Sequence, residues 1–169
     1  MSRSATGSVS FDGVPAEPVG TSTAYLQRAG FWHGAAGVAA CWLGGAERVA
    51  DTLRATGHRL DDHGAAHLGA VDAALAGARW TLYAAASEVD VDPDDRAAAT
   101  VRAMRVRAVA ESAAALTLDR VGRALGATPL ATDAAHTVAV TDLLVYVRQS
   151  HAERDLAALG RLVAHGATP

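Results

Sequence analysis

The sequence contains no lysine, isoleucine or asparagine, and its only cysteine among 169 residues is Cys41. A single cysteine excludes an internal disulfide and any zinc site that needs several cysteines. All fifteen basic residues are arginine, which we attribute to the coding bias of a GC-rich genome rather than to a selected surface. The net charge of −3 and the pI of about 6.1 give no reason to expect nucleic acid or an acidic membrane as a partner.

Long hydrophobic runs are also missing from the chain. Residues 1–20 contain no apolar stretch of signal-peptide length. The apolar stretches further on are interrupted too often by arginine, aspartate and glutamate to cross a bilayer. We therefore expect a cytoplasmic protein with no membrane contact.

Aromatic residues make up only 5% of the chain, although half of it is apolar, and alanine is the commonest residue. Alanine is the best helix former and has a small side chain, so alanine-rich helices can approach one another closely. A chain of this length forms one domain of ordinary size. The composition therefore predicts a single all-α domain.

Residues 1–20 differ from the rest because they are rich in serine, glycine and proline. The alternation over residues 8–11, followed by the turn pair Asp12-Gly13, predicts one strand and a turn. No later segment reads as a second strand, so this strand either lies loose or belongs to a sheet of another chain. We divide the chain into an irregular arm, residues 1–20, and a helical bundle, residues 21–169.

The first predicted helix runs from about Ser22 or Gly30 to Ala55 and stops at Gly57. Its apolar face has spacings of three and four residues and consists of Phe31, Val38, Trp42, Val49 and Leu53. It also holds four glycines, at positions 34, 37, 44 and 45, each of which costs about 1 kcal/mol relative to alanine in a helix interior. Such glycines indicate that another helix or a bound ligand comes close to the backbone.

Two further helices follow. One runs from about Gly64 to Asp90 and has the clearest stripe in the chain: Leu68, Val71, Leu75, Ala78, Leu82, Ala85 and Val89. The next begins with Asp92 as N-cap and Pro93 as first residue, and it ends near Leu125. Its predicted inner face consists of Val101, Met104, Ala108, Ala115 and Leu118.

The last segment, residues 132–164, reads as helix with a break near Ser150, because Ser150 and Glu153 have the spacing of a capping box. Together these segments predict an antiparallel up-and-down bundle of four to five helices with an irregular N-terminal arm. We expect it to self-associate or to bind a partner chain through exposed apolar surface.

Two groups of polar residues could carry chemistry. His63 and His67 have the spacing of a helical metal pair, but the turn at Gly64 favours a solvated loop, and we assign no metal site. The second group, residues 146–155, either forms helical ion pairs or places His151 beside a pocket as a proton-transfer group.

The order of four segments, residues 8–15, 30–40, 78–90 and 142–160, resembles the C-terminal part of the acyl-CoA dehydrogenase superfamily. The resemblance covers about residues 8–163 and implies a helical bundle whose preceding strand closes a β-domain that this chain lacks. It also implies FAD as cofactor and an acyl-CoA-like substrate. His151 is then the candidate catalytic residue, and Gln149, Ser150 and Glu153 are candidate FAD-binding residues.

The sequence departs from that family at several positions. The expected glutamate base is absent from residues 149–152, and Gln27 at the alternative position is not an acid. The arginine and phenylalanine-glycine pair that contacts a neighbour's FAD is replaced by residues 57–64. We therefore expect a subunit that is inactive without a chain supplying the flavin-binding domains. The alternative is a non-catalytic module for dimerisation or interaction.

Overall fold

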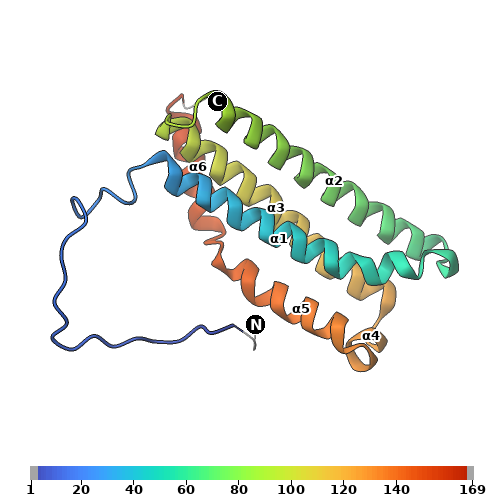
Figure 1. The fold of residues 1–169 in the computed structure, drawn as a ribbon. Coiled ribbons are helices and arrows are strands. Elements are labelled where there is room, and N and C mark those ends of the chain that lie inside the picture. Colours follow the sequence, from blue (N-terminus) through green and yellow to red (C-terminus); the bar gives the residue numbers. More distant parts are fainter. Residues whose placement is uncertain (1–3, 167–169) are drawn as a thin grey trace.

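The protein is all-α, and the computed structural model describes its residues 4–166. These residues form six α-helices and no strand: α1 (Ala29–Ala55), α2 (Asp62–Val91), α3 (Arg96–Leu125), α4 (Thr128–Thr132), α5 (Ala134–Tyr146) and α6 (Glu153–Ala164). Two short 3₁₀ turns, η1 (Gly57–Arg59) and η2 (Val147–Gln149), follow α1 and α5. The three long helices pack antiparallel and side by side (Figure 1), which confirms the predicted up-and-down bundle.

The predicted inner faces of α1 and α2 are confirmed. Trp42, Val49 and Leu53 of α1 are fully buried, and Phe31 and Val38 nearer its start are half-buried. The α2 stripe is buried or half-buried along its whole length, and it faces α1 and α3. The alternating spacing of three and four residues keeps one side of a helix turned toward its neighbours, so periodicity alone located both faces.

The α3 helix begins later than predicted, because Asp95 rather than Asp92 is its N-cap. The Asp95 carboxylate accepts hydrogen bonds from the amides of Ala97 and Ala98, at 2.9 and 3.0 Å. Asp92 instead accepts from the amides of Asp94 and Asp95 in the turn before the helix, at 3.3 and 3.2 Å. Two aspartates three residues apart offer the same capping chemistry, and the turn uses the first of them.

One residue of the predicted α3 inner face is exposed to solvent instead of facing the core. Ala115 is exposed, whereas Ala113 and Ala114 before it and Thr117 after it are buried. Three alanines in a row give no contrast in hydrophobicity, so the sequence does not tell which of them faces the core. The Thr117 hydroxyl is satisfied inside the helix, because it donates to the Ala113 carbonyl at 2.8 Å.

The predicted break near Ser150 is confirmed, but the capping box does not form. The N-cap of α6 is Ala152, whose φ of 43° lies in the left-handed region. Ser150 Oγ donates to Glu111 Oε2 at 2.6 Å and accepts from the Ala152 amide at 3.2 Å. The first turn of α6 is closed by Asp155, whose carboxylate accepts from the His151 amide at 3.4 Å. Tertiary bonding to α3 has replaced the local cap.

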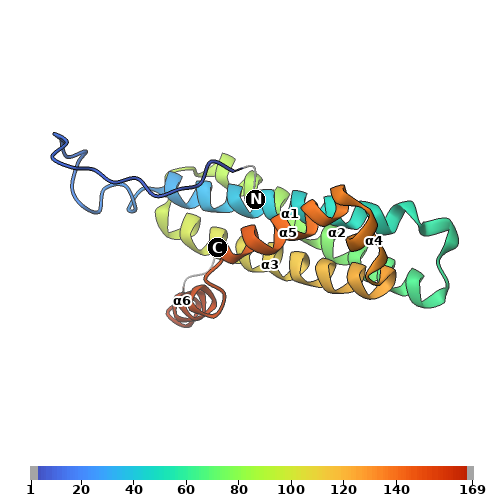
Figure 2. The ribbon, with the colours of Figure 1, turned by 90° about the horizontal axis from the view of Figure 1, so that it is seen from below.

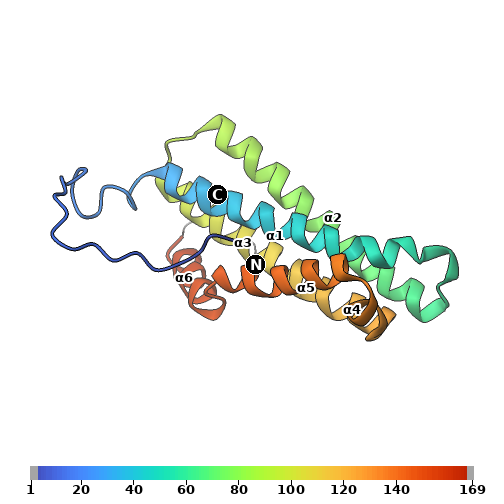
Figure 3. The same cartoon turned by 60° about the horizontal axis from the view of Figure 1, so that its bottom comes forward.

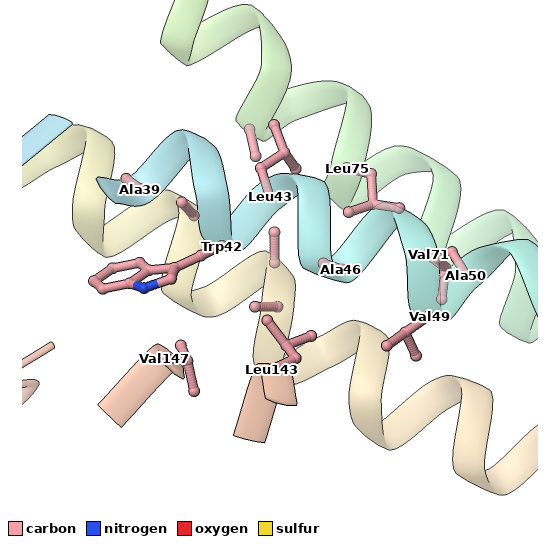
Figure 4. Close-up of a cluster of buried hydrophobic side chains, with 14 of the residues drawn as sticks. Ala39, Trp42, Leu43, Ala46, Val49, Ala50, Val71, Leu75, Leu143 and Val147 are labelled. Carbon is pink, nitrogen blue, oxygen red and sulfur yellow. The ribbon is translucent and has the colours of Figure 1, made fainter. Parts of the chain in front are cut away.

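The core is built from small aliphatic side chains around a single tryptophan, as the composition predicts. Figure 4 shows Trp42 and Leu43 of α1 among side chains of α2 and α3, with Leu143 and Val147 closing the cluster from below. The α5 helix lies close against α1 at Gly45, where an added Cβ would lie 3.1 Å from Leu143 Cδ1. This confirms that one of the four predicted glycines admits another helix. Figure 3 shows α5 running beside α1.

The described part of the arm, residues 4–20, forms no strand. Figures 1 and 2 show it running away from the start of α1 in a wide loop and then returning to the bundle, where Ser4 lines a cavity with residues of α1 and α5. Phe11 in this loop is 79% exposed. The prediction of a strand over residues 8–11 is therefore wrong for the chain by itself. No described segment offers a sheet edge to pair with, which leaves its backbone groups to water. The predicted turn is present, with Gly13 at a φ of 61°.

Within residues 4–166, no helix combines the length and the apolar character that a membrane span requires.

Candidate functional site

A cavity of about 610 Å³ lies where the start of α1, the middle of α3 and the start of α6 come together. We call it the arginine cleft, because Arg28, Arg107 and Arg154 line it from three separate segments. In Figure 2, α6 appears nearly end-on, so it crosses the direction of the long helices. His151 and Asp155 line the cleft on the α6 side.

One wall of the cleft is aromatic. Tyr25 and Phe31 meet edge to face with ring centroids 5.7 Å apart, and Phe31 meets Trp32 in the same way at 5.5 Å. The guanidinium of Arg28 lies over the Tyr25 ring at 4.4 Å. These rings hold one another in place, since edge-to-face pairs and cation–π contacts each add about 0.5–1.5 kcal/mol. The wall therefore offers a flat and partly apolar surface to a ligand.

Arg107 is the structural centre of the cleft. Its Nη1 donates to the Ala35 carbonyl of α1 at 3.3 Å, and its Nη2 donates to the Gln149 carbonyl of η2 at 3.0 Å. The same guanidinium lies over the Trp42 ring at 4.6 Å. One side chain of α3 thus joins α1, α3 and the segment before α6. Because the partners of Arg107 are two carbonyls and an aromatic ring, no carboxylate neutralises its positive charge.

The cleft has an excess of positive charge. Among the residues that the structure describes, no carboxylate lies within ion-pair distance of the three lining arginines. The carboxylate of Asp155, which also lines the cleft, lies beside His151 instead. Unpaired guanidinium groups in a concave site attract anions, above all carboxylates and phosphates, which match their fork of N–H donors.

His151 supplies the imidazole among the residues that line the cleft. Its Nδ1 lies 3.4 Å from Asp155 Oδ1, one helical turn further along the chain. A carboxylate beside Nδ1 favours the tautomer that carries a proton there, which leaves Nε2 as the nitrogen that accepts or delivers a proton. The imidazole is 57% exposed, so water and small solutes can reach it.

The four candidate residues predicted from the sequence, His151, Gln149, Ser150 and Glu153, have different surroundings in the structure. His151 lines the cleft, whereas Gln149 contributes only its carbonyl, which accepts from Arg107. The Ser150 hydroxyl is bonded to Glu111, and Glu153 is exposed and is not part of the lining. Of the four residues, only His151 lines the cleft, while Gln149 and Ser150 tie the chain to α3.

Sequence reasoning missed Arg28 and Arg107, and it placed Arg154 and Asp155 among helical ion pairs without pairing Asp155 with His151. Asp155 stands four residues after His151, a helical spacing that could have revealed the pair. The three arginines are far apart in the sequence, and only the packing of α1, α3 and α6 brings them together. Arginine at a helix surface is too common for its position alone to mark a site.

The glycines of α1 face different surroundings. Gly34 lines the arginine cleft, Gly37 lines a second cavity toward α2, and an added Cβ would meet nothing within 4 Å at either position. Gly44 is equally open but lines neither cavity. These three glycines therefore do not serve close helix packing as Gly45 does. Gly34 and Gly37 leave space beside the helix, each at one of the two cavities.

The predicted histidine pair lies in the first turns of α2, which begins at Asp62, so the expectation of a solvated loop at these residues is wrong. His63 and His67 line a polar cavity together with Arg59 and Arg123, and Asp61 caps α2 by accepting from the Gly64 amide at 2.8 Å. Within residues 4–166, no group of three or more histidine, cysteine, aspartate or glutamate side chains is placed to hold a metal ion. The two guanidinium groups would in addition repel a cation.

No family model matches this sequence, and no curated protein or solved structure matches it. What the arginine cleft binds must therefore follow from the side chains around it.

Proposed function

We propose that the chain is the helical-bundle subunit of a flavin-dependent oxidoreductase that resembles acyl-CoA dehydrogenases, and that the arginine cleft holds FAD. The observation that carries the proposal is the joining, in one cavity of about 610 Å³, of three guanidinium groups without carboxylate partners and an aromatic wall. This volume falls within the range of about 300–1,000 Å³ for small-molecule sites.

The side chains in the cleft suit the two halves of such a cofactor. Arg28 and Arg154 are exposed guanidinium groups whose N–H donors suit a pyrophosphate. Phe31, Trp32 and Met104 give the flat, polarisable surface that suits an aromatic ring system. Gly34 leaves space beside the helix for a bulky ring. A bound flavin supplies the redox chemistry that no amino-acid side chain provides.

Within this proposal, His151 moves a proton at its Nε2 while Asp155 holds the ring. No glutamate stands at the position of the family's base, so His151 is the group of the cleft that remains for this task. Turnover of an acyl-CoA-like substrate requires a further chain, either a flavin-binding partner or a second copy of this one. We place the assembly in the cytoplasm.

The proposal is tested by titrating FAD against the purified protein and following flavin fluorescence, with riboflavin as control. Riboflavin carries the same ring system but no phosphate, so it should bind at least ten times more weakly if the arginines grip phosphate through charge-assisted hydrogen bonds. Added salt should weaken FAD binding because the arginines are exposed. Absence of FAD binding at saturating concentration would overturn the proposal.

Matched variants locate the bound flavin. Arg28→Ala and Arg154→Ala remove exposed guanidinium groups, and each should weaken FAD binding about tenfold or more. Gly34→Leu fills the cleft and should have a similar effect, whereas Gly44→Leu adds the same side chain to the same helix outside it. Equal affinities of the two leucine variants would place the flavin elsewhere.

The second candidate function is that of a non-catalytic interaction module. It is favoured by large apolar side chains on outer helix faces, above all Trp80 and Tyr83 of α2, which are 69% and 65% exposed. Sedimentation velocity of the wild type and of Trp80→Glu tests this function. A dimer that the glutamate dissociates, together with no FAD binding, would favour the module over the flavoprotein subunit.

A further inference from the structure

A second cavity, of about 310 Å³, lies between the start of α1, the end of α2 and the start of α3. We call it the alanine cavity, because small side chains from all three helices line it, among them Ala36, Gly37, Ala85 and Ala103. Of the residues that the structure describes, Trp32 alone lines both this cavity and the arginine cleft. The alanine cavity is thus a separate space with a mostly apolar lining.

One buried charge lines this apolar space. Arg102 is only 9% exposed, and its Nε donates to Glu88 Oε2 at 2.9 Å. Its Nη1 is buried and has no hydrogen-bond partner within the described part of the chain. A buried N–H donor without an acceptor destabilises the folded state by about 1–3 kcal/mol. A guanidinium in this condition, beside an open apolar cavity, indicates an acceptor that comes from outside the chain.

The other polar groups of the cavity are already engaged or exposed. The ring of His33 is hydrogen-bonded through Nε2 to the Pro93 carbonyl at 2.8 Å, which fixes the turn before α3 over the start of α1. Asp90 also lines the cavity, but it is exposed to water. Neither group supplies the acceptor that Arg102 lacks.

We propose that the alanine cavity binds a small monocarboxylate with an apolar body. The body lies against Leu82, Val89 and the alanines, and the carboxylate accepts hydrogen bonds from the Arg102 guanidinium. The Glu88 side chain is 50% exposed, so its carboxylate can turn into water and release the guanidinium toward the ligand. The proposal does not depend on flavin binding in the arginine cleft.

The first experiment compares 3-phenylpropanoate with 3-phenylpropan-1-ol by isothermal titration calorimetry. The two probes have the same apolar body and differ in the carboxylate. The acid should bind at least ten times more tightly than the alcohol, because only the acid pairs with the buried guanidinium. Absence of binding by the acid, or equal affinity of the two probes, would overturn the proposal.

Variants then assign the site. Arg102→Met keeps an unbranched apolar stem and removes the guanidinium, and it should weaken binding of the acid at least tenfold while leaving the alcohol unchanged. Gly37→Leu fills the cavity but keeps Arg102, and it should weaken both probes. This second variant preserves the test if Arg102→Met does not fold, which far-UV circular dichroism reports.

Gly34→Leu provides the control that separates the two cavities. It adds the same side chain three residues earlier, in the arginine cleft, and should leave binding of the acid unchanged. If Gly34→Leu rather than Gly37→Leu abolishes binding of the acid, the probe occupies the arginine cleft and the alanine cavity is not the site. FAD binding is expected to show the opposite dependence on the two glycines, so failure of one proposal is distinguishable from failure of the other.

Discussion

Gly44 and Gly45 are neighbours in α1 with different surroundings, and replacing each by alanine tests how closely α5 lies against α1. A Cβ at Gly44 meets nothing within 4 Å, whereas at Gly45 it lies 3.1 Å from Leu143 Cδ1. Alanine is favoured over glycine in a helix interior by about 1 kcal/mol. Gly44→Ala should therefore raise the free energy of unfolding by about 1 kcal/mol.

Gly45→Ala has the same gain in helix propensity but adds a methyl group against a packed side chain. Leu143 is buried, so it can make room only by moving within the core. Overpacking of this kind costs about 1–3 kcal/mol. We expect Gly45→Ala to be less stable than Gly44→Ala by that amount, with a net change from the wild type between about zero and a loss of about 2 kcal/mol.

Urea unfolding followed by far-UV circular dichroism measures this difference between the two variants directly. Equal stabilisation by both alanines would refute the close approach of α5 to Gly45. A Leu143→Ala background provides the control, because the shortened side chain makes room for the added methyl. In that background, Gly44→Ala and Gly45→Ala should change the free energy of unfolding alike.

Three further predictions concern α2, α3 and α5. Leu75→Asp buries an unpaired charge at a fully buried position and should unfold the bundle, seen as loss of far-UV circular dichroism; melting close to that of the wild type would contradict the assigned face. Asp95→Ala should lower the free energy of unfolding in urea by about 1 kcal/mol and Asp92→Ala by less, and equal losses would contradict the cap assignment. Burial and, after it, the nearby Cys41 thiol raise the pKa of Tyr146 above its ordinary value of 10.0, so the folded state holds the phenol proton more tightly than the unfolded chain does. Stability should therefore be lost as the pH rises through about 10, and Tyr146→Phe, compared by urea midpoints at about pH 8 and about pH 11, should lack this loss.

Elements whose apolar residues recur at helical spacing were predictable from the sequence. The α2 stripe and the Trp42 face of α1 were assigned correctly because their apolar side chains recur every three or four residues and contrast with polar residues elsewhere on the helix. Predictions failed where that contrast is missing or where two residues offer the same local chemistry. Ala115 lies in a run of alanines, and Asp92 competes with Asp95 for the same cap.

The candidate site was predictable only in part. His151 stood out because it follows a helix break, and the structure places it in the largest of the cavities described above. The role of Arg107 could not be read from the sequence, since its partners are backbone carbonyls of Ala35 and Gln149. Such bonds depend on how helices pack and leave no mark on residue identity. The hydrogen bond of Ser150 was not predictable for the same reason, because its partner Glu111 belongs to another helix.

The α6 helix packs loosely on the bundle, and this affects how easily it detaches. None of its residues is buried, and α3 is its main neighbour. A helix that buries so little detaches at a lower free energy than the whole bundle unfolds, so its amide hydrogens should exchange with deuterium well before those of α1. Arg154 and Asp155 belong to α6 and move with it. One wall of the arginine cleft therefore detaches while the core stays folded.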